Sequence, residues 1–228
     1  MPGHFTFFTQ EVKDGLAFFS ESEAKHMIQV LRFSLADQIM FTDGFGNRFQ
    51  GEITAISKKE VQTKILNSAR VASPEFTLVV GVLKSTERME WLLEKSVELG
   101  VKRVVWVACD NSERSKIFLE KLMKTCVAAM KQSHGSWLPI LEFMSFKEAV
   151  ATYGGNQSYF AHCSEGLPFK PNSLASNSVV FIGPEGDFSE SEIKLAREFG
   201  MRELQLGSRI LRAETAAIAA CAAANLCG

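Results

Sequence analysis

The sequence predicts a two-part chain, with a small β-rich domain in residues 1–72 and an α/β domain in residues 73–228. The first part shows short alternating stretches separated by tight turns, which is typical of a small barrel. The second part alternates unbroken apolar strands with helices, the pattern of βαβ units around a buried parallel sheet. A short polar break, RVASPEF, contains Pro74 and marks the boundary.

Each element of the first part has a local signal. FTFF predicts a short strand, and SESEAKHMIQVLRF predicts a helix that a capping box of Ser20 and Glu23 opens. Apolar and polar residues alternate on both sides of DGFGN, which indicates a hairpin. EVQTKILNSARV predicts a further strand. Acidic and basic residues balance in this part, so we expect no general attraction to nucleic acid.

The second part opens with strand, helix and strand in TLVVGVLK, ERMEWLLEKSVELG and KRVVWVAC. KIFLEKLMKTCVAAMKQ predicts a long helix whose apolar stripe, from Leu119 to Met130, faces the core. A capping box of Ser145 and Glu148 opens the next helix. The strands SYFAHC and SVVFIG, a helix, the strand ELQLG and a final helix made almost wholly of alanine follow.

Composition excludes several classes of protein. The 228 residues are 46% hydrophobic and 22% charged with a net charge of −1, so nucleic acid binding must use local patches. The five cysteines are scattered, which favours reduced thiols over a disulfide framework or a metal site. The chain starts without a basic and apolar leader and has no apolar run of membrane-spanning length. We therefore expect a cytoplasmic protein without a metal.

Three predicted strand ends carry unusual loops: AHCSEG, FIGPEGDFSE and QLGSRILRAET. Open α/β sheets bind ligands at such ends. Ser189 and Glu192 form a capping-box pattern that fixes the helix after the second loop, with Phe188 and Ile193 at the staple positions. The glycines of GPEGD let a ligand approach the backbone closely. A plain strand-to-helix turn is the alternative.

The ligand chemistry of these loops is not that of a nucleotide phosphate. The sequence has neither a P-loop nor a G-x-G-x-x-G motif, and Glu185 and Asp187 would repel phosphate. A neutral or cationic ligand that bonds to the main chain, such as S-adenosylmethionine, fits better. Arg209 and Arg212 lie three residues apart at the start of the last helix. They either form a structural ion pair with Glu214 or Glu185, or face an electron-rich substrate.

FIGPEGDFSESEI followed by LGSRILRAETAAIAA resembles the C-terminal signature of the ribosomal small-subunit methyltransferase E family, of the SPOUT class. The likeness extends over nearly the whole chain: HMIQVLR and DGFGNRFQGEI resemble the family's PUA-like domain, and KSVELGVKRV, SERS and AMKQSHGSWLP its catalytic domain. The resemblance implies a deep C-terminal trefoil knot, a homodimer and S-adenosylmethionine as methyl donor. It also implies methylation of the N3 of one uridine of 16S rRNA, within the assembled small subunit.

Together, the loops and the resemblance predict the site residues. Arg212 is expected to stabilise charge on the uracil oxygens, and Glu185 to orient the base or accept its proton. The cofactor loops are expected to contribute His162, Ile182, Gly183, Pro184, Glu185, Gly186, Leu206, Gly207, Ser208, Ile210 and Leu211. RNA contacts are expected from His26, Arg32, Arg48, Arg114 and Lys131, with helix packing as the alternative role of His26.

Two positions depart from the family pattern. A second glycine is usual where Asp187 stands, and an arginine is common where Gly135 stands. Asp tolerates left-handed backbone angles better than most residues, so we expect the loop at Asp187 to keep its shape. Two other functions stay open on the sequence: a SPOUT-like methyltransferase of another RNA, and a non-catalytic RNA-binding protein with a vestigial knot.

Overall fold

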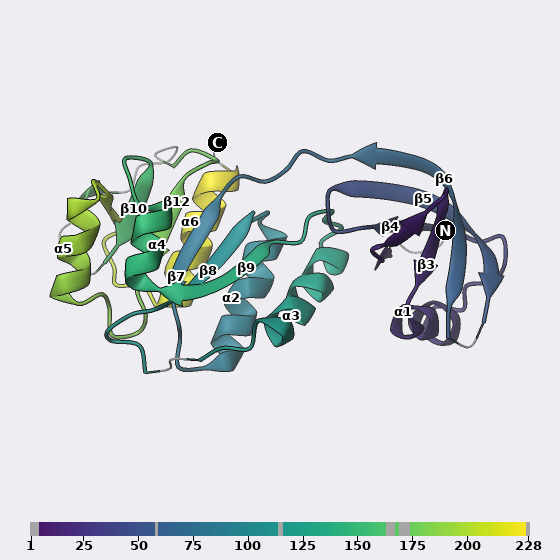
Figure 1. Cartoon of the computed structure of the whole chain (residues 1–228), viewed down its shortest axis with the longest axis horizontal. Coiled ribbons are helices and arrows are strands. Elements are labelled where there is room, and N and C mark those ends of the chain that lie inside the picture. Colours follow the sequence, from purple (N-terminus) through teal and green to yellow (C-terminus); the bar gives the residue numbers. More distant parts are fainter. Residues whose placement is uncertain (1–4, 58, 114–115, 163–166, 169–173, 227–228) are drawn as a thin grey trace. The chain divides into compact units, whose positions relative to one another are not determined.

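The computed structural model describes residues 5–57, 59–113, 116–162, 167–168 and 174–226. The chain divides into two compact units. Unit 1 comprises residues 1–73 together with residues 127–138, and unit 2 comprises residues 74–126 and 139–228. The predicted fold class, an α/β domain preceded by a PUA-like β domain, is confirmed (Figure 1). Among the described residues, no helix has both the length and the apolar character needed to cross a membrane.

Unit 1 is built on a curled six-stranded sheet with the order β1-β4-β5-β6-β3-β2. All its neighbouring strands are antiparallel except β1 and β4, which run parallel. A helical segment follows β3 as α1 (Glu21–Lys25) and the π-helix η1 (His26–Val30). The strands are β1 (Thr6–Phe8), β2 (Glu11–Lys13), β3 (Leu16–Phe19), β4 (Gln38–Thr42), β5 (Asn47–Ile56) and β6 (Val61–Arg70).

The core of unit 1 is largely aromatic. The rings of Phe7 and Phe41 each meet Phe19 edge to face, and Phe41 stacks on Phe49 at 4.9 Å between centroids. Such contacts add to the burial of apolar area. The predicted DGFGN hairpin joins β4 to β5, and the Asp43 carboxylate accepts from the backbone N–H groups of Phe45 and Asn47. The sequence did not indicate the β2–β3 hairpin.

The capping box predicted at Ser20 does not form. Ser20 is the residue before α1, but its hydroxyl lies 3.1 Å from the Ser22 hydroxyl and does not cap the helix. Glu23, the expected reciprocal partner, forms an ion pair with Lys131 instead. A tertiary charge pair therefore replaces the local hydrogen bond that the pattern predicts.

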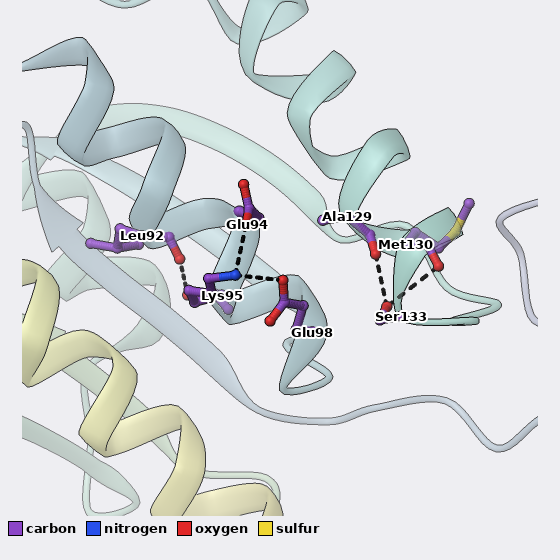
Figure 2. A network of polar contacts seen from close by, with 8 residues as sticks. Leu92, Glu94, Lys95, Glu98, Ala129, Met130 and Ser133 are labelled. Atoms are coloured by element: carbon purple, nitrogen blue, oxygen red, sulfur yellow. Dashed lines mark hydrogen bonds and ion pairs between the residues drawn. The ribbon is translucent and has the colours of Figure 1, made fainter.

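Residues 127–138 complete unit 1. The Trp137 indole N–H donates to the Val71 carbonyl at 3.2 Å, and the Gly46 N–H donates to the Ser136 carbonyl at 2.7 Å. Gly46 has φ +92°, and a Cβ atom there would collide with the Trp137 ring. The Ser133 hydroxyl caps the preceding helix by donating to the Ala129 carbonyl at 2.8 Å (Figure 2). This short segment therefore packs as part of the β domain.

Unit 2 contains a seven-stranded parallel sheet with the order β11-β13-β10-β12-β7-β8-β9. The strands are β7 (Thr77–Gly81), β8 (Arg103–Ala108), β9 (Ile140–Ser145), β10 (Ser158–Ala161), β11 (Leu167–Pro168), β12 (Val179–Ile182) and β13 (Arg202–Gln205). The helices are α2 (Thr86–Glu98), α3 (Leu119–Gln132), α4 (Phe146–Tyr153), α5 (Glu190–Glu198) and α6 (Ala213–Leu226). The sequence did not indicate β9 and β11. Helix α3 begins in unit 2 and ends in unit 1.

Small side chains bring α6 close to its neighbours. Six of its alanines are buried, and α6 contacts α2 as well as β7 and β12. At the contact with α2, the Cys221 sulfur lies 3.7 Å from the hydroxyl of Ser96, which donates to the Leu92 carbonyl. The neighbouring Lys95 side chain binds Glu94 and Glu98, at 2.7 and 2.8 Å (Figure 2). The alanine-rich sequence thus serves close helix packing.

Candidate functional site

A cavity of about 400 Å³ lies at the carboxyl ends of β10, β12 and β13, within unit 2. Its volume is in the range of small-molecule sites, about 300–1,000 Å³. The loops after β12 and β13 are two of the three that the sequence indicated, and residues 163–166 of the third lie outside the described part of the chain. Of the eleven predicted cofactor residues, which include Glu185, every one except Gly186 lines the cavity, and so does Arg212. The additional lining residues are Arg88, Ala161, Asp187, Leu204, Gln205, Arg209, Ala213 and Ala216.

The loop after β12 is rigidly anchored. The expected capping box forms at α5: the Ser189 hydroxyl accepts from the Glu192 N–H, and the Glu192 carboxylate accepts from the Ser189 N–H. Asp187 has φ +59°, the left-handed conformation that a glycine adopts most easily. Asp187 therefore adopts the left-handed conformation that aspartate tolerates better than most residues.

The loop after β13 exposes its backbone to the cavity. Gly207 has φ +149°, a conformation that L side chains rarely adopt, and an added Cβ atom there would meet nothing within 4 Å. Residues 207–210 are all exposed. Because no side chain covers this turn at Gly207, its amide groups are accessible to a ligand.

His162 forms the inner wall at the end of β10. Its side chain is only 2% exposed, and its ring stacks on Phe160 with 5.1 Å between centroids. The Nε2 atom lies 2.9 Å from a Glu203 carboxylate oxygen. The Arg197 side chain donates to the same carboxylate, and this hydrogen bond is the main reason that the pKa of Glu203 is lowered. His162 is thus held by a charged partner behind it.

Glu185 is held by Lys84 and by Arg88 of α2. The Lys84 N–H donates to both Glu185 oxygens, at 3.3 and 3.4 Å, and the Arg88 guanidinium lies 3.8 Å from one of them. Arg88 Nε also lies 3.7 Å from a carboxylate oxygen of Glu214, whose residue is 9% exposed. Among the described residues, the other Glu214 oxygen is buried without a hydrogen-bond partner.

Arg88 is the main residue of the site that the sequence did not indicate. The structural ion pairs considered for Arg209 and Arg212 do not form within the described part of the chain, because Arg88 lies between the two carboxylates. The sequence feature that could have pointed to Arg88 is its place in the first turn of a helix that follows a strand, with Ser85 as the N-cap. The missing information was the sheet order, which places β7 beside β12.

The predicted RNA residues lie in unit 1, apart from Arg114, which is outside the described residues. Arg48 is exposed and donates to the His134 carbonyl at 2.9 Å. Arg32 is exposed, with φ +60°. The His26 side chain is exposed and meets the Phe7 ring edge to face, which is compatible with the packing alternative. Lys131 is largely buried against Glu23.

Comparison with known proteins identifies the class. A family model described as an RNA methyltransferase domain matches residues 71–225, and a model of the RNA methyltransferase PUA domain matches residues 19–66. The chain belongs to this RNA methyltransferase family, and the resemblance to ribosomal small-subunit methyltransferase E is confirmed.

Particular relatives make the class more specific. Ribosomal RNA small subunit methyltransferase E of Rickettsia conorii is 25% identical over 217 residues, covering 92% of this chain and 88% of that protein. A "probable rRNA-methyltransferase" of Porphyromonas gingivalis is 30% identical, with a TM-score of 0.85 over 95% of both chains. The structure of ribosomal RNA small subunit methyltransferase E from Neisseria gonorrhoeae, bound to S-adenosyl methionine, is 26% identical with a TM-score of 0.81. That match covers 96% of this chain and 95% of the other.

Proposed function

We propose that the protein transfers a methyl group from S-adenosylmethionine to the N3 of one uridine in 16S rRNA. The observation that carries the proposal is the cavity in unit 2, which the end of β10 and the loops after β12 and β13 line together, with Glu185 and Arg212 among their residues. Family membership and the cofactor in the Neisseria gonorrhoeae relative support it.

The residues present fit this cofactor. S-adenosylmethionine carries a sulfonium and an ammonium as well as a carboxylate, and the cavity wall has groups of both signs. The acidic side chains are Glu185 and Asp187, and the basic ones are Arg88, Arg209 and Arg212. The exposed turn at Gly207 offers main-chain groups for polar contacts. When bound, the cofactor supplies an electrophilic methyl group.

The chain's own residues must handle the charge that develops on uracil. Uracil N3 carries a proton at neutral pH, and loss of this proton leaves negative charge that N3 shares with the two neighbouring carbonyl oxygens. Arg212 is exposed on the cavity wall, and no ion pair occupies it among the described residues, so its guanidinium can donate to those oxygens. Glu185, held by the Lys84 N–H, is the candidate that orients the base or accepts its proton. Because N3 lies on the pairing edge, the uridine must be unpaired or flipped out.

Unit 1 supplies the proposed RNA contacts that lie within the described residues. Arg32 and Arg48 are exposed there, whereas Lys131 would have to leave Glu23 before it could bind a phosphate. We therefore place the main phosphate contacts on the two arginines. The trefoil knot, the homodimer, the assembled small subunit as substrate and the cytoplasmic location belong to the same proposal.

The decisive experiment maps methylated nucleotides by mass spectrometry in small subunits from cells with and without this protein. Purified protein incubated with S-adenosylmethionine and unmethylated subunits should restore the single missing N3-methyluridine. Methylation of another RNA, with the small subunits left unmethylated, would support the alternative in which the protein methylates a different RNA. Cofactor binding without any methyl transfer would favour the non-catalytic alternative.

A further inference from the structure

The segment after β8 supports the loop from Gly183 to Phe188, which is called the cofactor loop below. The Asn111 side-chain amide donates to two successive carbonyls of that loop, Gly186 at 3.0 Å and Asp187 at 3.2 Å. Asp187 lines the cavity, whereas Asn111 does not. Asn111 therefore acts on the cavity wall from behind.

The contact is close because residue 186 is a glycine. A Cβ atom added at Gly186 would lie 3.0 Å from the Asn111 Cβ and 3.3 Å from the Asn111 carbonyl oxygen. Glycine at this position thus allows the amide to reach both carbonyls. A larger residue would force the two segments apart.

The two hydrogen bonds act where the loop is strained. Asp187 has φ +59°, which costs free energy for any residue with a Cβ atom. Its N–H donates to the Pro184 carbonyl at 3.0 Å, so the strained residue closes the GPEGD turn. Asn111 binds the carbonyl of this residue and of the one before it. The two hydrogen bonds from Asn111 therefore offset the backbone strain at Asp187 itself.

A separate set of contacts fixes the helix that follows. The Asp110 carboxylate accepts from the hydroxyls of Ser189 and Ser191, at 2.6 and 3.1 Å. The backbone N–H of Asp110 donates to the Glu192 carboxylate at 3.1 Å. These contacts hold the N-terminus of α5. Asn111 acts nearer the cavity, on residues 186 and 187.

We infer that Asn111 is a positioning residue of the cofactor site, which holds the loop from Gly183 to Phe188 in its binding conformation. The inference rests on the proposed function, since it takes S-adenosylmethionine to be the ligand whose affinity depends on the conformation of this loop. It gives Asn111 a role in cofactor affinity and none in the chemical step.

The test compares Asn111→Ala and Asn111→Asp with the wild type by calorimetry and steady-state kinetics with S-adenosylmethionine. Asn111→Ala should bind the cofactor about tenfold more weakly, because two carbonyl groups of the loop lose their hydrogen-bond donor. Asn111→Asp has the same shape but presents an oxygen to two carbonyls, so it should bind still more weakly. The KM for the cofactor should rise in both, while kcat at saturating cofactor stays within about twofold.

Asp187→Gly tests the link to backbone strain. Glycine adopts a positive φ readily, so the loop should need Asn111 less. In the Asp187→Gly background, Asn111→Ala should weaken cofactor binding by less than about threefold. Asn177→Ala is the matched control, because Asn177 is exposed and precedes β12 at the end opposite to Gly183. It should change neither affinity nor kcat.

Hydrogen exchange separates this inference from the proposed function. Asn111→Ala should speed amide exchange in residues 183–188 of the free protein, whatever ligand the cavity takes. Wild-type protein that binds no S-adenosylmethionine would refute the proposed function. Hydrogen exchange would still test whether Asn111 holds the loop from Gly183 to Phe188. Normal affinity and normal exchange in Asn111→Ala, or an Asn111→Asp variant as tight as wild type, would overturn the inference.

Discussion

At the scale of single residues, Arg212 separates a catalytic site from a structural turn. Among the described residues it forms no ion pair, although it lines the cavity. Arg212→Ala should therefore keep its melting temperature and cofactor affinity but lose roughly a hundredfold or more in single-turnover rate on small subunits. Arg212→Lys should recover little, because an ammonium lacks the planar pair of donors. Near-normal turnover by folded Arg212→Ala would exclude a catalytic role.

For Arg88 we expect a loss of stability, in contrast to the loss of turnover expected for Arg212. Its guanidinium is the partner of the largely buried Glu214, one of whose oxygens has no hydrogen-bond partner in the described structure. Arg88→Ala should lower the free energy of unfolding by about 1–3 kcal/mol, because it leaves that carboxylate without a countercharge. Adding Glu214→Gln should recover most of the loss, since the amide is neutral. Denaturant unfolding of both variants and of Glu214→Gln alone measures the coupling, and additive effects would refute the pairing.

These residues show how much of a site a sequence can predict. Gly183, Gly207 and their neighbours could be named because glycine loops after predicted strands have a local signal. Arg88 and Asn111 could not be, because their roles depend on which strands are neighbours. Asn111 follows β8, Arg88 follows β7, and the loop that both contact follows β12. Sheet order is a tertiary property that no short pattern contains.

At the scale of elements, two capping boxes of the same type offer a matched comparison. Ser145 caps α4 and Ser189 caps α5, and each accepts from the N–H of a Glu three residues later. Replacing either serine by alanine should lower the free energy of unfolding by about 1 kcal/mol. Only Ser189 follows the cofactor loop and binds Asp110, so only Ser189→Ala should also weaken cofactor binding. Equal effects of the two variants on calorimetric affinity would contradict this.

The same scale shows where local signals fail. The Ser20 pattern is as good as the other two, but Glu23 pairs with Lys131, 108 residues away in sequence. Strand β9 has the sequence ILEFMS, in which Glu142 interrupts the apolar run typical of a parallel strand, and none of its residues is buried. Its pairing with β8 is reinforced by the ion pair of Arg103 with Glu142, which also accepts from Tyr153. Edge strands of this kind are held by neighbours that the sequence does not reveal.

At the scale of the whole molecule, the division of the chain is not linear. The apolar stripe of α3 reads as one continuous helix, and nothing in it indicates that residues 127–138 belong with the β domain. The segment is recruited by tertiary contacts. They include the Trp137 hydrogen bond to Val71 and the Arg70 guanidinium, which lies 5.1 Å from the Trp137 ring centroid.

A fragment that begins at Pro74 tests this division. It would keep residues 127–138 but lose their partners in residues 1–73, including Glu23 for Lys131 and Val71 for Trp137. The exposed segment should make the fragment less soluble, and hydrogen exchange should show residues 127–138 losing protection while β7 and β12 keep theirs. Co-expression with residues 1–73 should restore that protection. As a control, Lys131→Met in the full chain removes one ion pair only and should leave the segment protected. A fragment whose residues 127–138 exchange as slowly as in the full chain would show that the segment folds with the α/β domain instead.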